Sequence, residues 1–151
     1  MNLTEEPEIV TWPETHYVYI EKTGPFKTNA PVAWTEAHKL LPALLEHNKL
    51  TAYLSLYEVG PLVYRAGFAI DAPPVDLPAG LTYEQFHGGK FSRFVLTGPY
   101  TDLGTATSRV FEIVAEKGIE VREGFNIENY TNDPRVTPAE ELVTEILVAT
   151  K

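Results

Sequence analysis

The stretch Leu96-Thr97-Gly98-Pro99-Tyr100 resembles an earlier stretch, Lys22-Thr23-Gly24-Pro25-Phe26. In both places a Thr-Gly-Pro-aromatic step follows a segment in which apolar and polar residues alternate, which is the pattern of a β-strand. In both places a helical pattern and two further strand patterns come next. We therefore expect the chain to contain the order strand–helix–strand–strand twice.

Hydrophobic periodicity places these elements along the whole chain. Strands are expected at residues 16–22, 51–58, 62–70, 81–86, 91–97, 125–130 and 143–149, and helices at residues 33–47 and 102–117. Pro42 lies inside the first helical pattern and predicts a kink or a break there. Gly118 is placed to end the second helix, and His87-Gly88-Gly89-Lys90 is expected to form a hairpin turn.

The order of these elements predicts one domain made of two modules. The expected divisions are a lead-in at residues 1–14, a first module at 15–70, a proline-rich connector at 71–80 and a second module at 81–151. In the lead-in, Ile9 and Val10 are expected to add to a sheet edge. The predicted fold class is α+β, with two pseudo-symmetric modules whose antiparallel sheets surround a central ligand cleft.

The composition restricts the classes of function. The chain has 151 residues, 44% of them hydrophobic, which is enough for one domain with a real core. It has no cysteine, so disulfides, thiolate metal sites and a cysteine nucleophile are excluded. The net charge of 12 − 21 = −9 argues against direct nucleic-acid binding. Without a membrane-length apolar segment or a basic signal peptide, we expect a cytoplasmic protein with no membrane contact.

Alternation in the strands also predicts a candidate ligand site. We expect the aliphatic positions to face the helix of each module. The positions expected on the opposite face are Tyr17, Tyr19, Tyr53, Ser55, Tyr57, Glu128, Tyr130 and Glu145. Aromatic walls with a few polar groups are typical of small-molecule sites. A carboxylate among tyrosines attracts organic cations, and contact with ring faces adds about 0.5–2 kcal/mol.

Two alternatives remain open for these residues. Tyrosine has a high β propensity, so the same face also fits an ordinary solvent-exposed sheet. Trp34, near the start of the first helical pattern, either lines the groove or anchors the core. Loss of solvation would raise the pKa of a glutamate in such a groove and make it a usable proton donor or acceptor.

Other chemistries have little support in the sequence. The four histidines are scattered and show no metal-ligand spacing: His16, His38, His47 and His87. No serine stands in a nucleophile-elbow pattern, and Gly88-Gly89-Lys90 lacks the rest of a phosphate-binding loop. We therefore predict neither a metal nor a cofactor.

Two segments near the C-terminus carry a family resemblance. The run Glu128-Asn129-Tyr130-Thr131-Asn132-Asp133-Pro134 has the form Glu-x-Tyr-x-x-Asp-Pro, and Thr144-Glu145-Ile146 follows in the last predicted strand. With these motifs the chain resembles the GyrI-like small-molecule-binding domains, the effector-binding fold of multidrug-responsive transcription activators. The resemblance covers about residues 15–148. It implies that Glu145 lies in the central cleft and contacts hydrophobic, often cationic ligands.

The resemblance leaves three functions open. The chain lacks a helix-turn-helix pattern, so it resembles the stand-alone members, and the first expectation is capture of hydrophobic, often cationic aromatic compounds by a monomer or homodimer. In that function Glu145 is the key carboxylate, and the further ligand-binding residues are Tyr130, Glu128, Tyr19, Tyr53, Tyr57, Trp34 and Tyr17. The second is hydrolysis of cyclopropane-bearing xenobiotics, with Glu145 as general base and Tyr130 or Trp34 positioning the substrate. The third is modulation of DNA gyrase by an acidic protein.

Overall fold

The computed structural model describes residues Met1 to Lys151 and has an α+β fold with two helices and nine strands. The chain divides into two compact units. The terminal unit contains both chain ends, Met1–Trp12 and Gly89–Lys151, and the middle unit is Pro13–Gly88. Neither helix combines the length and the hydropathy that a membrane-spanning helix needs.

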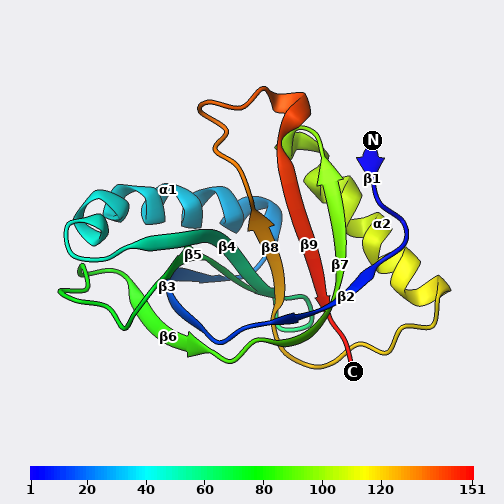
Figure 1. Ribbon diagram of the computed structural model, residues 1–151, viewed down its shortest axis with the longest axis horizontal. Coiled ribbons are helices and arrows are strands. Elements are labelled where there is room, and N and C mark those ends of the chain that lie inside the picture. The colour runs from blue at the N-terminus through cyan, green and yellow to red at the C-terminus, as the bar shows by residue number, and fades with distance from the viewer. The chain divides into compact units, whose positions relative to one another are not determined.

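The middle unit is an antiparallel sheet with one helix on it (Figure 1). Its strands, in the order β4-β5-β3-β6, are β4 (Leu50–Glu58), β5 (Val63–Ile70), β3 (Thr15–Thr23) and β6 (Thr82–Phe86). Helix α1 (Phe26–Leu45) packs on β3 and β5. The helix starts earlier than predicted and continues through Pro42, so the predicted break is wrong. Pro42 is exposed, so water can satisfy the carbonyl that it leaves without a donor.

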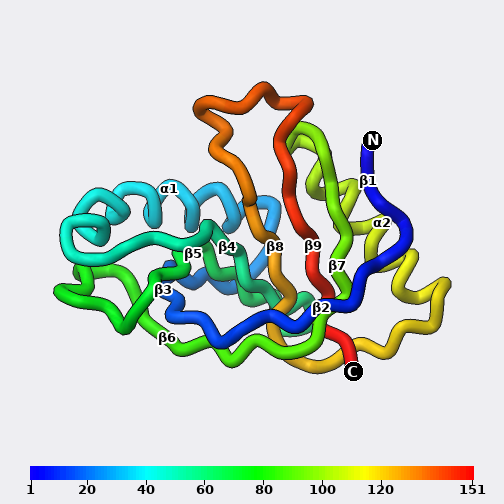
Figure 2. The backbone as a smooth tube through the Cα atoms, in the orientation of Figure 1, coloured from blue at the N-terminus to red at the C-terminus, as the bar shows by residue number.

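The terminal unit repeats this arrangement. Its strands are β8 (Asn126–Tyr130), β9 (Val143–Ala149) and β7 (Gly89–Thr97), in the order β8-β9-β7, and the short strands β1 (Asn2–Leu3) and β2 (Glu8–Trp12) both pair with β7 (Figure 2). Helix α2 (Leu103–Glu116) is followed by Gly118, whose φ of 64° suits the predicted helix end. Two short 3-10 turns complete the unit, η1 (Tyr100–Asp102) and η2 (Ala139–Glu141).

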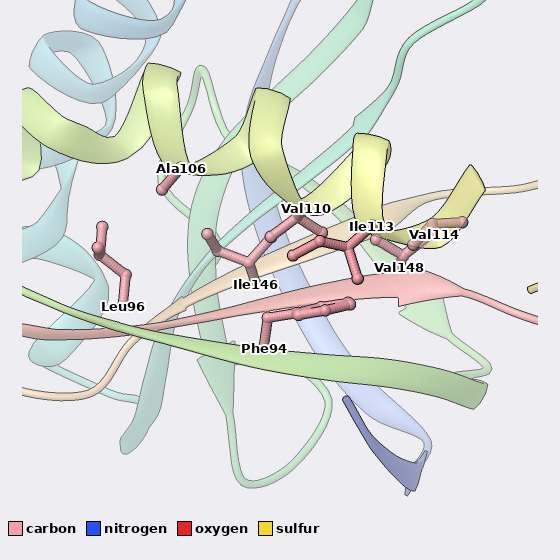
Figure 3. Packing of buried hydrophobic residues seen from close by; sticks show 8 residues of the cluster. All are labelled: Phe94, Leu96, Ala106, Val110, Ile113, Val114, Ile146 and Val148. Carbon is pink, nitrogen blue, oxygen red and sulfur yellow. The ribbon is translucent and has the colours of Figure 1, made fainter. Parts of the chain in front are cut away.

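Helix α2 and two strands enclose the apolar core of the terminal unit (Figure 3). Its members come from β7, α2 and β9 and are Phe94, Leu96, Ala106, Val110, Ile113, Val114, Ile146 and Val148. On both strands these are the even-numbered residues, so one face of the sheet is defined by its contact with α2.

Two edge strands pair with a strand far away in the sequence rather than with the strand that follows them in the chain. Strand β6 comes just before β7 in the sequence but pairs with β3, and β2 comes just before β3 but pairs with β7. The strand expected at the start of the second module (81–151) therefore belongs to the middle unit. For the same reason His87-Gly88-Gly89-Lys90 is not a hairpin turn, and the expected lead-in supplies two strands of the terminal unit.

The predicted internal repeat is present, and an equivalent hydrogen bond in each unit aligns the two copies residue by residue. The Gly24 N–H donates to the Leu62 carbonyl at 2.9 Å, and the Gly98 N–H donates to the Leu142 carbonyl at 2.8 Å. Both glycines have a positive φ, 124° and 148°. A side chain is unfavourable there, which explains why glycine stands at both positions. Strands β3, β4 and β5 are thus equivalent to β7, β8 and β9.

Candidate functional site

The strand register separates the two glutamates of the family motif. Glu128 pairs with Ile146, and Tyr130 pairs with Thr144. Because Ile146 belongs to the core under α2, and directly opposed residues share a face, Glu128 and Tyr130 lie on the helix-covered face. Glu145 pairs with Asn129, and both side chains lie on the opposite face of the same sheet.

The tyrosines that were predicted to share one face of the middle unit lie on both faces of its sheet. Trp34 of α1 contacts Ser55, Tyr64 and Phe68, so these residues and their partners Tyr53 and Tyr57 lie on the helix-covered face. Tyr17 and Tyr19 lie on the other face together with Leu54 and Leu56. The prediction that all these tyrosines share one face is wrong. Both faces of β4 are substantially buried, so alternation alone could not tell which set meets the helix.

Glu128 is held only by hydroxyl groups. The Tyr130 hydroxyl donates to Oε1 at 2.8 Å, and Thr107 Oγ1, from α2, lies 3.4 Å from Oε2. No lysine, arginine or histidine forms an ion pair with this carboxylate. Burial raises the pKa of Glu128, although the hydrogen bonds from Tyr130 and Thr107 act in the opposite direction. Glu128 is therefore a partly buried carboxyl group without a positive partner.

A second tyrosine packs against Tyr130. Tyr100 of η1 packs against Tyr130 with its ring at 70° and the centroids 5.6 Å apart. Burial raises the pKa of Tyr100, and the negative charge of Asp133 raises it further. Thr144, beside Tyr130 on the next strand, has a buried hydroxyl with no hydrogen-bond partner. Glu128, Tyr130, Tyr100 and Thr107 are called the Glu128 cluster below.

Glu145 has a different environment. Arg93 Nη1 lies 3.1 Å from its Oε2, and Asn129 Nδ2 donates to its Oε1 at 2.8 Å. Arg93 also forms an ion pair with Glu8 of the neighbouring strand β2. The Glu145 charge is therefore compensated inside the terminal unit, and both of its oxygens accept hydrogen bonds.

The helix-covered face of the middle unit carries an aromatic cluster around Trp34. The indole Nε1 donates to Ser55 Oγ at 3.2 Å and to the Tyr64 hydroxyl at 2.9 Å, and these two oxygens are 2.6 Å apart. The Trp34 ring also lies beside His38, with the centroids 5.5 Å apart. The cluster continues through the rings of Phe68, Tyr53, Phe26 and Tyr57.

Tyr17 and Tyr19 take part in a separate stack. Their rings are parallel within 15° and 5.2 Å apart, and the Arg65 guanidinium lies 4.3 Å from the Tyr19 ring centroid. Tyr17 is fully buried and donates its hydroxyl to the Leu54 carbonyl at 2.8 Å. Arg65 is itself paired with Glu21 and Glu84. A cation of the protein thus already lies over the Tyr19 ring.

The repeat assigns an equivalent to each motif residue. Counted from the two glycine hydrogen bonds, Glu145 is equivalent to Arg65, and Arg93 is equivalent to Tyr19. These positions contact each other in both units, as a cation over a ring in one and as an ion pair in the other. Contact between these two positions is therefore a structural feature of the repeat.

Glu128 is equivalent to Ser55, a neutral residue. Likewise Tyr57 is equivalent to Tyr130, and each meets the aromatic residue of the Gly-Pro-aromatic step, Phe26 in one unit and Tyr100 in the other. The repeated tetrapeptide could have identified Tyr100 as a site residue. Thr107 and Arg93 had no such signal, because their roles depend on contacts between elements.

The structure brings together some predicted site residues and separates others. It places Glu128 next to Tyr130, and it places Trp34, Tyr53 and Tyr57 on one face of the middle unit. Glu145 lies apart from Glu128, and Tyr17 and Tyr19 lie apart from Tyr53 and Tyr57. No three His, Asp or Glu side chains gather where they could share a metal ion.

Solved structures with low sequence identity share this fold. SAV2435 bound to tetraphenylphosphonium is 16% identical with a TM-score of 0.77, and the match covers 97% of this chain and 94% of that chain. The EcmrR C-terminal domain is 15% identical with a TM-score of 0.76, covering 100% of this chain and 99% of that chain. A hydrolase from Listeria innocua is 12% identical with a TM-score of 0.62, covering 98% of this chain and 93% of that chain.

No curated protein matches the chain in a sequence comparison. A family model does match, over residues 5–151, and it describes a GyrI-like small molecule binding domain. The match covers nearly the whole chain, and the two-helix, antiparallel α+β architecture agrees with it. The chain therefore belongs to the GyrI-like family of small-molecule-binding domains.

Proposed function

We propose that this protein binds a hydrophobic aromatic cation and that Glu128 supplies the compensating negative charge. The observation that carries this proposal is a partly buried carboxyl group that has no positive partner and accepts a hydrogen bond from Tyr130, whose ring packs against Tyr100. Partial burial without a positive partner disfavours the ionised form of Glu128, and a bound cation would stabilise that form. The ring faces of Tyr130 and Tyr100 would contribute about 0.5–2 kcal/mol more.

The surroundings of the two motif glutamates support Glu128 over Glu145. A ligand cation at Glu145 would compete with Arg93, which is already within 3.1 Å. A ligand cation at Glu128 would displace no charged group, because only hydroxyls contact that carboxylate. A bound cation therefore meets no competing positive charge at Glu128, whereas it would meet Arg93 at Glu145.

The internal repeat adds an independent argument. Ser55 occupies the position equivalent to Glu128 and satisfies the middle unit with neutral hydrogen bonds to Trp34 and Tyr64. The fold therefore does not need a carboxylate at this position of the repeat. A carboxyl group placed there without a positive partner is therefore a candidate functional group.

Further ligand-contacting residues are proposed for each unit by itself. Tyr130 and Tyr100 belong to the Glu128 cluster, and Trp34, Tyr53 and Tyr57 are proposed as stacking surfaces of the middle unit. Tyr17 and Tyr19 are weaker candidates, because one is fully buried and Arg65 covers the ring of the other.

Tetraphenylphosphonium, the ligand of SAV2435, is a suitable probe because its charge is permanent. Calorimetric titration should show that it binds at least about tenfold more tightly than neutral triphenylphosphine oxide, a difference of about 1.4 kcal/mol. Glu128→Gln should remove this preference, whereas Glu145→Gln should leave most of it. Equal affinity for the two probes in the unchanged protein would refute the proposal.

A second candidate function is hydrolysis of a reactive, cyclopropane-bearing compound. The raised pKa of Glu128 supports it, because a general acid or base works best when its pKa lies near the operating pH. Water would add across the strained carbon–carbon bond, giving one C–OH and one C–H bond. Incubation with such a compound should give the ring-opened product, and Glu128→Gln should abolish it. Formation at an unchanged rate by the variant would exclude Glu128 from this role.

A further inference from the structure

We propose that binding of an aromatic cation at Glu128 releases a proton from this carboxyl group, so that the site exchanges a proton for the cation. This inference rests on the proposed function and adds a dependence on pH to it. The exchange conserves charge: the neutral carboxyl and the free cation become a carboxylate–cation pair and a solvated proton.

The hydrogen-bond partners of Glu128 fit both protonation states. A hydroxyl group can donate and accept, so the hydroxyls of Tyr130 and Thr107 can donate to a carboxylate or accept from a carboxylic acid. No bond has to be lost when the proton leaves. The network therefore permits a change of charge without a change of fold.

The partners of Glu145 are of another kind. Arg93 offers N–H donors and no acceptor, and Asn129 presents its amide nitrogen to Oε1. The two carboxyl groups of the sheet thus differ in their surroundings, because only Glu128 is contacted by groups that can both donate and accept.

The groups around Glu128 supply no charge that would replace the proton. Strand β8 presents Tyr130, helix α2 presents Thr107, and η1 presents Tyr100 through the Tyr130 ring. Asp133 acts on Tyr100, but its charge is negative and raises the pKa of that tyrosine. Burial raises the pKa of Glu128, so the free protein retains the proton to a higher pH than a solvated glutamate does.

Calorimetric titration of the full chain with tetraphenylphosphonium tests the exchange. Titrations between pH 5 and 8, in buffers of different ionisation enthalpy, measure how many protons leave on binding. Below the pKa of free Glu128 the release should approach one proton, and affinity should rise by about tenfold per pH unit. Above that pKa both effects should disappear. Triphenylphosphine oxide, which is neutral, should show neither.

Two variants connect the proton to this residue. Glu128→Gln should show affinity independent of pH and no proton release, even if its affinity is lower. Glu123→Gln removes an exposed carboxylate elsewhere in the terminal unit and should behave like the unchanged protein. Circular dichroism at each pH shows that the variants are folded.

The outcomes separate this inference from the proposed function. Tight binding of tetraphenylphosphonium with no proton release and no pH dependence would overturn the exchange and leave cation binding standing. Proton release that persists in Glu128→Gln would assign it to another group and also overturn the exchange. Failure of tetraphenylphosphonium to bind at any pH would overturn both.

Discussion

Glu128 and Glu145 lie on opposite faces of one antiparallel sheet, because the cross-strand neighbour of Glu145 is Asn129 and not Glu128. Glu128 meets hydroxyl groups on the side of α2, and Glu145 meets Arg93 on the other side. Two acidic residues of one motif thus have different electrostatic environments. Only one of them remains without a positive partner, which is why our proposals place the ligand charge at Glu128.

The stability of the protein should depend on pH through Glu128. Its folded pKa is raised above the unfolded value, so its contribution to stability is complete below the unfolded pKa and is lost as the pH rises through the folded pKa. Glu128→Gln should therefore unfold at a higher urea concentration than the unchanged protein at pH 7–8. The difference should shrink as the pH falls toward 4.5. A constant difference at all pH values would contradict this assignment.

The Arg93–Glu145 pair should stabilise the terminal unit. The two side chains are 30% and 19% exposed, so we expect a coupling free energy of about 1 kcal/mol. A double-mutant cycle with Arg93→Met and Glu145→Gln, measured by urea unfolding, gives this value. The exposed pair Lys117–Glu6 provides the control, with an expected coupling below about 0.5 kcal/mol. Equal coupling in the two cycles would mean that burial of the Arg93 pair has no effect.

Gly67 should not tolerate a side chain. A Cβ there would lie 2.2 Å from the Val18 carbonyl oxygen and 2.8 Å from the Tyr19 Cβ. Gly67→Ala should cost about 3 kcal/mol in the free energy of unfolding, since backbone must move to make room. Gly104→Ala, in α2, meets nothing within 4 Å and should stabilise the protein by about 0.5–1 kcal/mol. Chemical denaturation of both variants checks this, and similar effects would show that close packing is not the cause.

Trp34, Ser55 and Tyr64 should act as one hydrogen-bonded group. Trp34→Phe removes the N–H that donates to both hydroxyls, and Ser55→Ala removes one of the acceptors. Each change should cost about 1 kcal/mol. The double variant should cost less than the sum, because the shared hydrogen bond is lost only once. Additive losses in equilibrium unfolding would show that the group is not coupled.

Much of the architecture could be predicted because its signals are local. Alternation over 16–22 and 143–149 predicted strands that the structure has at Thr15–Thr23 and Val143–Ala149. The Thr-Gly-Pro-aromatic repeat predicted two equivalent modules, and both glycines make the same hydrogen bond. The positive φ of these glycines is a property of the backbone at a single residue, so the sequence reveals it directly.

Local sequence patterns could not predict which strands the edge strands pair with, or which side chains lie on which face of the sheet. Strand β6 pairs with β3 across a long stretch of chain, and no local pattern distinguishes β3 from β7 as its partner. A period of two residues is the same whichever set of side chains meets the helix. The aliphatic residues Leu54 and Leu56 face away from α1, so the assumption that the helix covers the aliphatic set failed in β4.

The amino-acid sequence by itself determined the family, the repeated order of elements and the residue types available to the site, because these depend on motifs and short-range periodicity. Only the tertiary structure decided which glutamate lacks a counter-charge. That property depends on Arg93, Asn129, Tyr130 and Thr107, which reach the two carboxylates from other positions in the chain. Electrostatic energy is set by distance and burial in the folded protein, and these follow from packing rather than from position in the chain.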